Sequence, residues 1–201
     1  MRTIKETTER KIYNSLIRWY DHANADQIKS GLNWYADAQA YAGSLSKRFG
    51  IDPYTAAAVI SALSPNNKWD RNKVDAYSVC DAWANGRGSD SVSCCTYNAN
   101  KEKAFDILNG NIELSSRSPK THSFAMNVGM LSPKHVTVDK WHVRACITRP
   151  DENIVETRDN ITAAQYRRIE AITNMVSEEV GLMAYEFQAI VWVTIKDAWN
   201  R

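Results

Sequence analysis

Lys120 and Asp139 are the two residues whose types and spacing suggest covalent chemistry. A lysine amine acts as a nucleophile when its surroundings favour the neutral form, and a carboxylate nearby can accept its proton or stabilise a cation on a sugar. Each residue alone is more often a solvated charge or part of an ion pair. The segment Thr137–Asp139 is typical of a carboxylate at a helix N-cap, so the pair predicts amine attack on an electrophilic carbon.

A short turn, Ser115–Pro119, comes directly before Lys120 and an apolar helical segment. The backbone N–H groups at the start of such a helix can hold a phosphate without reading base identity. A plain surface loop is the other interpretation, and the turn alone favours it.

Helices account for nearly all of the elements that must position these side chains. Hydrophobic periodicity and capping residues predict helices over residues 5–30, 34–49, 54–63, 69–84, 101–108, 162–180 and 184–199, besides the one after Lys120. Gly31 is expected to break the first of these, and Asp52-Pro53 to start the third. Asn98 or Asn100 is expected to cap the fifth helix, and Thr162 the sixth. His135–Val138 is the only strand-like run and residues 150–160 read as a polar linker, so the predicted fold class is all-α.

Composition leaves most function classes open. The formal net charge of +2 does not by itself indicate a nucleic acid partner, although a local basic patch could still bind phosphates. The first twenty residues lack the apolar core of a signal peptide, and no apolar run reaches membrane-span length. The chain has four cysteines, and their spacing is not that of metal ligands: Cys80, Cys94, Cys95 and Cys146. We therefore expect reduced thiols and no zinc or iron–sulfur site. Together with the missing signal peptide, this predicts a soluble intracellular protein without a targeting signal.

The segment Leu114–Arg144 resembles the helix-hairpin-helix DNA glycosylase superfamily. That family has a hairpin L-P-G-x-G-x-K-T, followed by V-D-x-H-x-x-R. In this chain Leu114–Thr121 reads LSSRSPKT and Val138–Arg144 reads VDKWHVR, so the lysine, threonine, aspartate and arginine fall in step. Upstream, Tyr97–Lys101 is similar to the family's Y-N-x-K segment.

Two further matches resemble the 8-oxoguanine branch of the superfamily. Ser64–Asn67 is similar to its S-S-N-N-N segment, in which an asparagine fills the space left by the extruded base. Gly181–Trp192 is similar to its G-P-Y-A-G-W-A-Q-A-V-L-F segment. The resemblance implies that four residues contact the base: Asn66, Asn67, Gln188 and Trp192. Gln188 would be hydrogen-bonded to the flipped base, and Trp192 would be stacked on it. From the residues alone, Asn66-Asn67 is equally an ordinary helix C-cap, and Trp192 is equally a core residue.

The resemblance implies a two-lobed, helix-hairpin-helix glycosylase-like unit over residues 1–201, with a cleft between lobes. One lobe would hold residues 50–110, the hairpin and catalytic segment residues 111–149, and the other lobe residues 1–49 and 160–201. The implied activity is DNA glycosylase with AP lyase, in which Lys120 is the nucleophile and Asp139 the stabilising carboxylate. It needs no metal or cofactor, and its partner is DNA, duplex rather than single-stranded, bound by a monomer. The implied DNA-backbone contacts are Ser116, Arg117, Ser118, Thr121, His142 and Arg144.

The chain departs from the family at three positions. Ser116 and Ser118 replace hairpin glycines, and Trp141 stands where the family has histidine, with His142 one place later. Two alternatives therefore stay open. One is a phage-type transferase on the same fold, which attaches an amine or amino acid to an activated thymine in DNA. The other is a DNA-binding module without catalysis.

Overall fold

The computed structural model describes residues 2–152 and 157–199, and these residues form an almost entirely helical protein, as predicted. The chain divides into two compact units, residues 1–36 with 132–201 (unit 1) and residues 37–131 (unit 2). The predicted hairpin and catalytic segment is thereby divided between the units after Leu131. Helix α2 (Ala25–Phe49) contributes its first part to unit 1 and the rest to unit 2.

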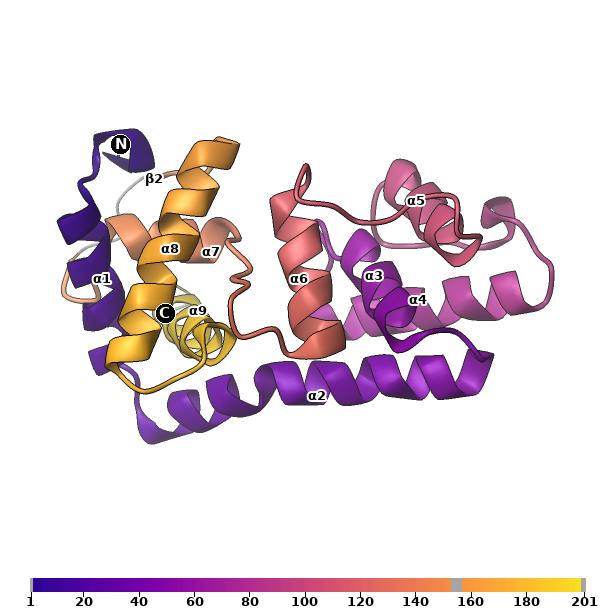
Figure 1. The fold of residues 1–201 in the computed structure, drawn as a ribbon, viewed down its shortest axis with the longest axis horizontal. Helices are drawn as coiled ribbons and strands as arrows, with labels where there is room; N and C mark the ends of the chain where they lie inside the picture. Colours follow the sequence, from indigo (N-terminus) through magenta and orange to yellow (C-terminus); the bar gives the residue numbers. More distant parts are fainter. Residues whose placement is uncertain (1, 153–156, 200–201) are drawn as a thin grey trace. The chain divides into compact units, whose positions relative to one another are not determined.

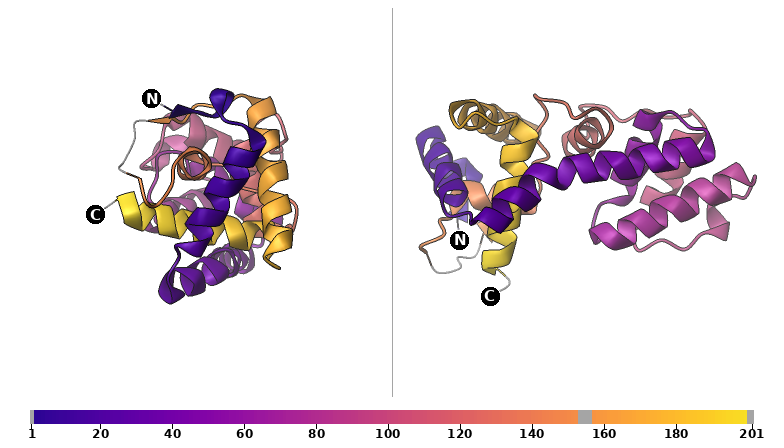
Figure 2. Two further views of the ribbon diagram at one scale, coloured as in Figure 1. Left: turned by 90° about the vertical axis from the view of Figure 1, so that its left-hand side faces the viewer. Right: turned by 90° about the horizontal axis from the view of Figure 1, so that it is seen from below.

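Unit 1 holds the terminal helices together with the segment after Leu131. Its elements are the first part of α2, the strands β1 (Arg2–Thr3) and β2 (Thr157–Arg158), the 3-10 helix η1 (Ile4–Glu6), and the helices α1 (Glu9–Asp21), α7 (Lys140–Ile147), α8 (Ala163–Glu179) and α9 (Ala184–Trp199). Helix α1 packs against α7, α8 and α9, which lie around it in the left view of Figure 2. Their apolar faces bury one core, which includes Trp19, Ile169 and Phe187.

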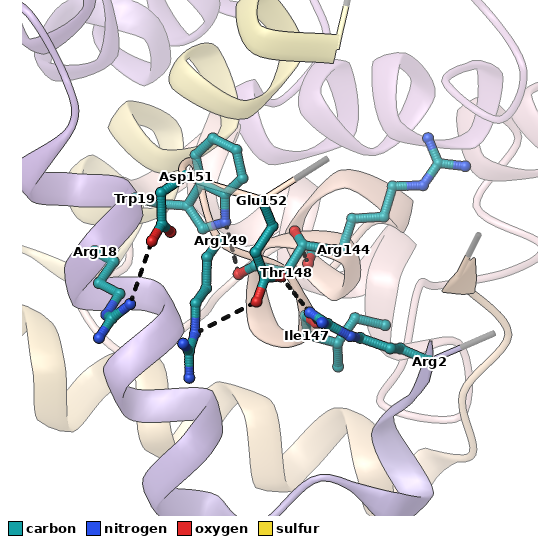
Figure 3. A network of polar contacts seen from close by, with 9 residues as sticks. All are labelled: Arg2, Arg18, Trp19, Arg144, Ile147, Thr148, Arg149, Asp151 and Glu152. Atoms are coloured by element: carbon teal, nitrogen blue, oxygen red, sulfur yellow. Dashed lines mark hydrogen bonds and ion pairs between the residues drawn. The ribbon is translucent and has the colours of Figure 1, made fainter. Parts of the chain in front are cut away.

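A polar network closes the carboxyl end of α7 (Figure 3). Trp19 Nε1 donates to the Thr148 carbonyl at 3.1 Å, and the Arg2 guanidinium donates to the Ile147 carbonyl at 3.1 Å. Arg2 and Arg149 both pair with Glu152. The carbonyls at the end of a helix need such donors, so the network holds α7 by the end opposite to Asp139.

The predicted strand-like run His135–Val138 pairs with no strand among the described residues. Side chains of α8 replace a partner strand, because Tyr166 donates its hydroxyl to the Val136 carbonyl at 2.5 Å and accepts from Val138 N at 3.2 Å. Val136 and Val138 are buried in the unit 1 core. The two short strands instead pair in parallel, with Arg2 opposite Thr157.

Unit 2 is built around one helix, labelled α3 in Figure 1, whose residues 56–63 are all buried. Its elements besides the second part of α2 are α3 (Pro53–Leu63), α4 (Trp69–Ala84), the 3-10 helix η2 (Ser89–Ser91), α5 (Asn98–Leu108) and α6 (Pro119–Met130). Helix α3 packs against α4, α5 and α6. It runs antiparallel to α6, since Ser61 donates to the Thr121 carbonyl at 2.6 Å while Gly129 lies beside Ala57.

Local capping signals predicted several helix ends correctly. Asp52 caps α3 by accepting from Tyr54 N and Thr55 N, and Pro53 is the first helical residue. Thr162 and Gln165 form a capping box at the start of α8. Polar residues 150–160 come before it, although residues 153–156 of that predicted linker lie outside the described residues.

Two predicted boundaries were wrong. Helix α5 starts at Asn98 after Tyr97, and neither Asn98 nor Asn100 is its cap. Gly31 does not break a helix but lies inside α2, and the break falls between Asp21 and Ala25. A Cβ on Gly31 would lie 2.5 Å from Ile190 Cα, so the glycine allows α2 to approach α9 closely.

Candidate functional site

Asp139 is the N-cap of α7, as predicted, and its carboxylate joins two helices of unit 1. Its Oδ1 atom accepts from the backbone N–H of His142 at 2.9 Å. Its Oδ2 atom accepts from Trp192 Nε1 of α9 at 3.0 Å. The positive end of the α7 dipole favours a negative charge here, so this position suits an ionised carboxylate.

Trp192 is half-buried and contacts a second indole and a cation. The ring of Trp34, from α2, approaches it at 5.8 Å between centroids with the planes 60° apart. The ammonium of Lys196 lies 3.9 Å from the centroid of the Trp192 ring, an attractive cation–π geometry. The Trp192 indole therefore links a cation, a second indole and the Asp139 carboxylate.

Gln188 lies one helical turn before Trp192 on α9, so both side chains leave the same face. Its Oε1 atom accepts from the Tyr35 hydroxyl at 2.8 Å, and both residues are buried. Tyr35 also contacts Trp34 edge to face. Three of the residues proposed from sequence thus belong to one connected cluster of unit 1: Asp139, Gln188 and Trp192.

His142, proposed as a DNA-backbone contact, is a core residue, and that prediction is corrected. Its side chain is fully buried, so it cannot reach a phosphate. Its Nε2 atom lies 2.9 Å from Thr173 Oγ1, which itself donates to the Ile169 carbonyl. Nε2 therefore carries the proton and donates, while Nδ1 has no hydrogen-bond partner among the described residues. Burial lowers the pKa of His142 to about 3.

The low pKa of His142 predicts acid sensitivity of the fold. Between pH 6.5 and about 3, His142 binds a proton in the unfolded chain but stays neutral in the folded chain. The free energy of unfolding therefore falls as the pH falls through that window. From pH 7 to pH 5 this contributes a loss of about 2 kcal/mol. Urea unfolding at both pH values should show that His142→Gln lacks this loss, whereas His22→Gln, at an exposed site, keeps it. Equal pH dependence in the wild type and His142→Gln would contradict the assignment.

Arg144, also proposed as a phosphate contact, is engaged inside unit 1. Its Nε and NH2 atoms donate to Asp159 Oδ2 at 3.1 and 2.7 Å. Its guanidinium lies over the rings of Trp141 and Trp199, at 4.7 and 5.3 Å from their centroids. These contacts satisfy the cation within the protein, which assigns Arg144 to holding α7, α9 and Asp159 together.

The remaining proposed residues belong to unit 2, where several surround the start of α6. Lys120 is exposed at the second position of α6, directly after Pro119. The proposed backbone contacts Ser116, Arg117 and Ser118 are exposed on the preceding turn, and Thr121 donates its hydroxyl to the Ser118 carbonyl at 3.1 Å. Asp139 belongs to unit 1, so Lys120 and Asp139 lie in different units.

Asn66 and Asn67 have different environments at the end of α3. Asn67 donates to the Leu63 carbonyl at 3.2 Å and to Asp75 Oδ2 at 2.8 Å, so it caps α3 and holds a buried carboxylate. Asn66 is exposed, has a φ of 58°, and donates to the hydroxyl of exposed Tyr97 at 3.0 Å. Of the two, Asn66 is the more exposed.

Thiol chemistry is disfavoured at three of the four cysteines. Burial raises the pKa of Cys80 to about 12 and that of Cys94 to about 11, and it also raises the pKa of Cys146. These thiols stay protonated at neutral pH, so they are not nucleophiles. No group of three histidine, cysteine, aspartate or glutamate side chains with metal-site geometry occurs in residues 2–152 and 157–199.

Sequence reasoning missed Trp34, Tyr35 and Lys196. Lys196 follows Gln188 and Trp192 at the same four-residue interval, which a search for a polar stripe on α9 would have found. Trp34 and Tyr35 follow Gly31 by about one turn of α2. Only the knowledge that Gly31 faces Ile190 places these two rings beside α9.

In the described part of the chain, no helix has the length and apolar character needed to cross a membrane.

Comparisons with known proteins give one finding, the family of the chain. No curated protein and no solved structure matches the chain. Residues 1–199 match the profile described as "Family of unknown function (DUF7178)", and the chain therefore belongs to that family.

Proposed function

We propose that this protein is a DNA glycosylase with AP lyase activity, which releases a damaged or modified base flipped out of DNA. The observation that carries the proposal is the connected cluster of Asp139, Trp192 and Gln188 in unit 1. Asp139 is far in the sequence from Gln188 and Trp192, and two separate motifs of the glycosylase superfamily singled out Asp139 on one side and the Gln188–Trp192 pair on the other. The finer fold assignment, a two-lobed helix-hairpin-helix glycosylase-like fold with a cleft between its lobes, belongs to the same proposal.

The proposed chemistry starts with extrusion of the nucleotide, because the glycosidic bond is inaccessible inside a duplex. Base binding would have to uncover Gln188, which is buried with its Oε1 atom on the Tyr35 hydroxyl. Its Nε2 amide would then donate to the base, and Trp192 would contact the base ring. As the C1′–N bond breaks, the base leaves with the electron pair, and Asp139 stabilises the positive charge that develops on the sugar. Its position at the N-cap of α7, where the helix dipole favours a negative charge, orients the carboxylate for this role.

Strand cutting would follow from attack by Lys120. Its amine adds to C1′ and loses a proton, the sugar ring opens to give a Schiff base, and elimination then breaks the bond to the 3′ phosphate. Ser116, Arg117 and Ser118 on the exposed turn before Lys120, and Thr121 in the first turn of α6, would supply backbone and side-chain donors to the phosphates. Asn66, exposed nearby at the end of α3, would enter the space left by the base.

The role of Lys120 predicts a covalent adduct. Borohydride reduction during reaction with a base-modified duplex should trap a protein–DNA species in the wild type, because it reduces the Schiff base to a stable amine. Lys120→Gln should lose at least about nine-tenths of that species. Lys47→Gln, an exposed lysine of α2 in the same unit, is the matched control and should trap normally. An undiminished adduct in Lys120→Gln would remove this role from Lys120.

Labelled duplexes that carry a panel of damaged and modified bases test the reaction itself. Release of one base creates a site that hot alkali cleaves, and cleavage without alkali adds lyase activity. A DNA strand that gains mass without losing its base would instead identify an amine or amino acid transferase. DNA binding with no product on any base would leave a binding module.

A further inference from the structure

The sequence singled out Trp192 as a ring on which a base stacks, but its indole N–H group makes a separate contact. Its Nε1–H donates to Asp139 Oδ2 at 3.0 Å, which links α9 to the N-cap of α7. The Lys196 ammonium lies over the same ring, 3.9 Å from its centroid. Lys196 is one helical turn after Trp192, so α9 alone fixes the relative positions of cation and indole.

The terminal torsion of an aspartate has a broad, two-fold profile, so hydrogen bonds to both oxygens help to define the orientation of the Asp139 carboxylate. The His142 N–H holds Oδ1 at 2.9 Å and the Trp192 N–H holds Oδ2. Two donors in fixed positions define the plane of the carboxylate. A cation over the indole withdraws electron density from the ring, which strengthens the N–H as a donor.

We propose that Trp192 and Lys196 are positioning residues, which orient the Asp139 carboxylate through the indole N–H and the cation above the ring. This inference rests on the proposed glycosylase function for its kinetic consequence. It differs from stacking in what it requires of residue 192. Stacking needs only an aromatic face, whereas positioning needs the N–H group.

Trp192→Phe separates these two roles because it keeps an aromatic ring and removes the donor. Under single-turnover conditions we expect base release to slow between about 10- and 100-fold, as for other small misplacements of a catalytic group. The Kd for the DNA should stay within about twofold of the wild type. Lys196→Met should slow release by a smaller factor, and Lys196→Arg, which keeps the cation, should restore at least half of the wild-type rate.

Unit 2 provides matched controls for both substitutions. Trp83 Nε1 donates to Asn109 Oδ1 at 3.0 Å, and Lys73 lies 5.7 Å from the centroid of the Trp69 ring. Trp83→Phe and Lys73→Met should leave rate and Kd unchanged. A wild-type rate in Trp192→Phe would overturn the inference, and so would a parallel loss of rate and DNA affinity.

A second measurement needs no substrate and separates failure of this inference from failure of the proposed function. In ¹H–¹⁵N spectra, the indole signal of Trp192 is identified as the one missing from Trp192→Phe. It should move in Asp139→Asn, because the Nδ2 amide that replaces Oδ2 cannot accept from the indole N–H, and move less in Lys196→Met. If the wild type releases no base from any duplex, the proposed function fails while these shifts still report the contact. An indole signal that is unchanged in Asp139→Asn overturns the inference whatever the activity.

Discussion

Asp139→Asn is expected to slow base release on the order of 10²- to 10³-fold while the fold and the DNA affinity stay close to those of the wild type. The physical reason is that asparagine removes the negative charge but keeps the side-chain shape. Its Oδ1 atom can still accept from the His142 N–H, and asparagine is as good an N-cap as aspartate. The rate of release under single turnover, the Kd and the urea midpoint together check this expectation.

Asp52→Asn is the matched control for this substitution. Asp52 caps α3 by accepting from Tyr54 N and Thr55 N, which is the same local chemistry in unit 2. We expect it to release base at the wild-type rate. If Asp139→Asn retained more than about a tenth of the wild-type rate, Asp139 would not be the charge-stabilising group of the reaction.

Gly31→Ala is expected to destabilise the protein by about 3 kcal/mol, at the upper end for overpacking in a core. The added Cβ would lie 2.5 Å from both Cα and Cγ1 of Ile190 and 2.6 Å from its backbone N. Backbone atoms of α9 cannot move aside as a flexible side chain would. Since α9 carries Gln188 and Trp192, we also expect the substitution to displace the site.

Gly43→Ala, in the same helix α2, controls for helix propensity. A Cβ at Gly43 meets nothing within 4 Å, so alanine there should stabilise the helix by about 0.5–1 kcal/mol. Urea unfolding of the two variants should therefore show shifts of opposite sign. A Gly31→Ala protein as stable as the wild type would contradict the close packing of α2 on α9.

Local sequence signals predicted helix ends wherever the capping residues make their bonds within a few positions. Asp52, Thr162 and Asp139 are all caps as expected, because N-cap hydrogen bonds need no partner from elsewhere in the chain. The helix break predicted at Gly31 was wrong because the role of this glycine depends on a distant residue. A glycine marks either a break or a close approach, and only the position of Ile190 decides between the two.

The run His135–Val138 shows the same dependence on distant residues. Its consecutive β-branched residues are typical of a strand, but side chains of α8 bond to its backbone. The Tyr166 hydroxyl donates to the Val136 carbonyl and accepts from the Val138 N–H. The actual strands, Arg2–Thr3 and Thr157–Arg158, are too short to leave a hydrophobic pattern.

The candidate site was predictable in part. Motif matches pointed to Asp139, Gln188 and Trp192, which the fold of unit 1 brings into one cluster. No motif distinguishes an exposed histidine or arginine from a buried one, so His142 and Arg144 were given phosphate roles although one is fully buried and the other is paired with Asp159. Burial and pairing depend on α8 and on residues after α7, which lie outside the motif.

The most direct test of the central claim is to follow both products of a single incubation by mass spectrometry. Purified protein is mixed with duplexes that each carry one modified base, and the free base and the intact strand are measured together. We predict that one base appears free in solution while its strand loses the corresponding mass, and that Asp139→Asn produces neither change. Strands that bind the protein and keep every base at its original mass would contradict the assignment as a glycosylase.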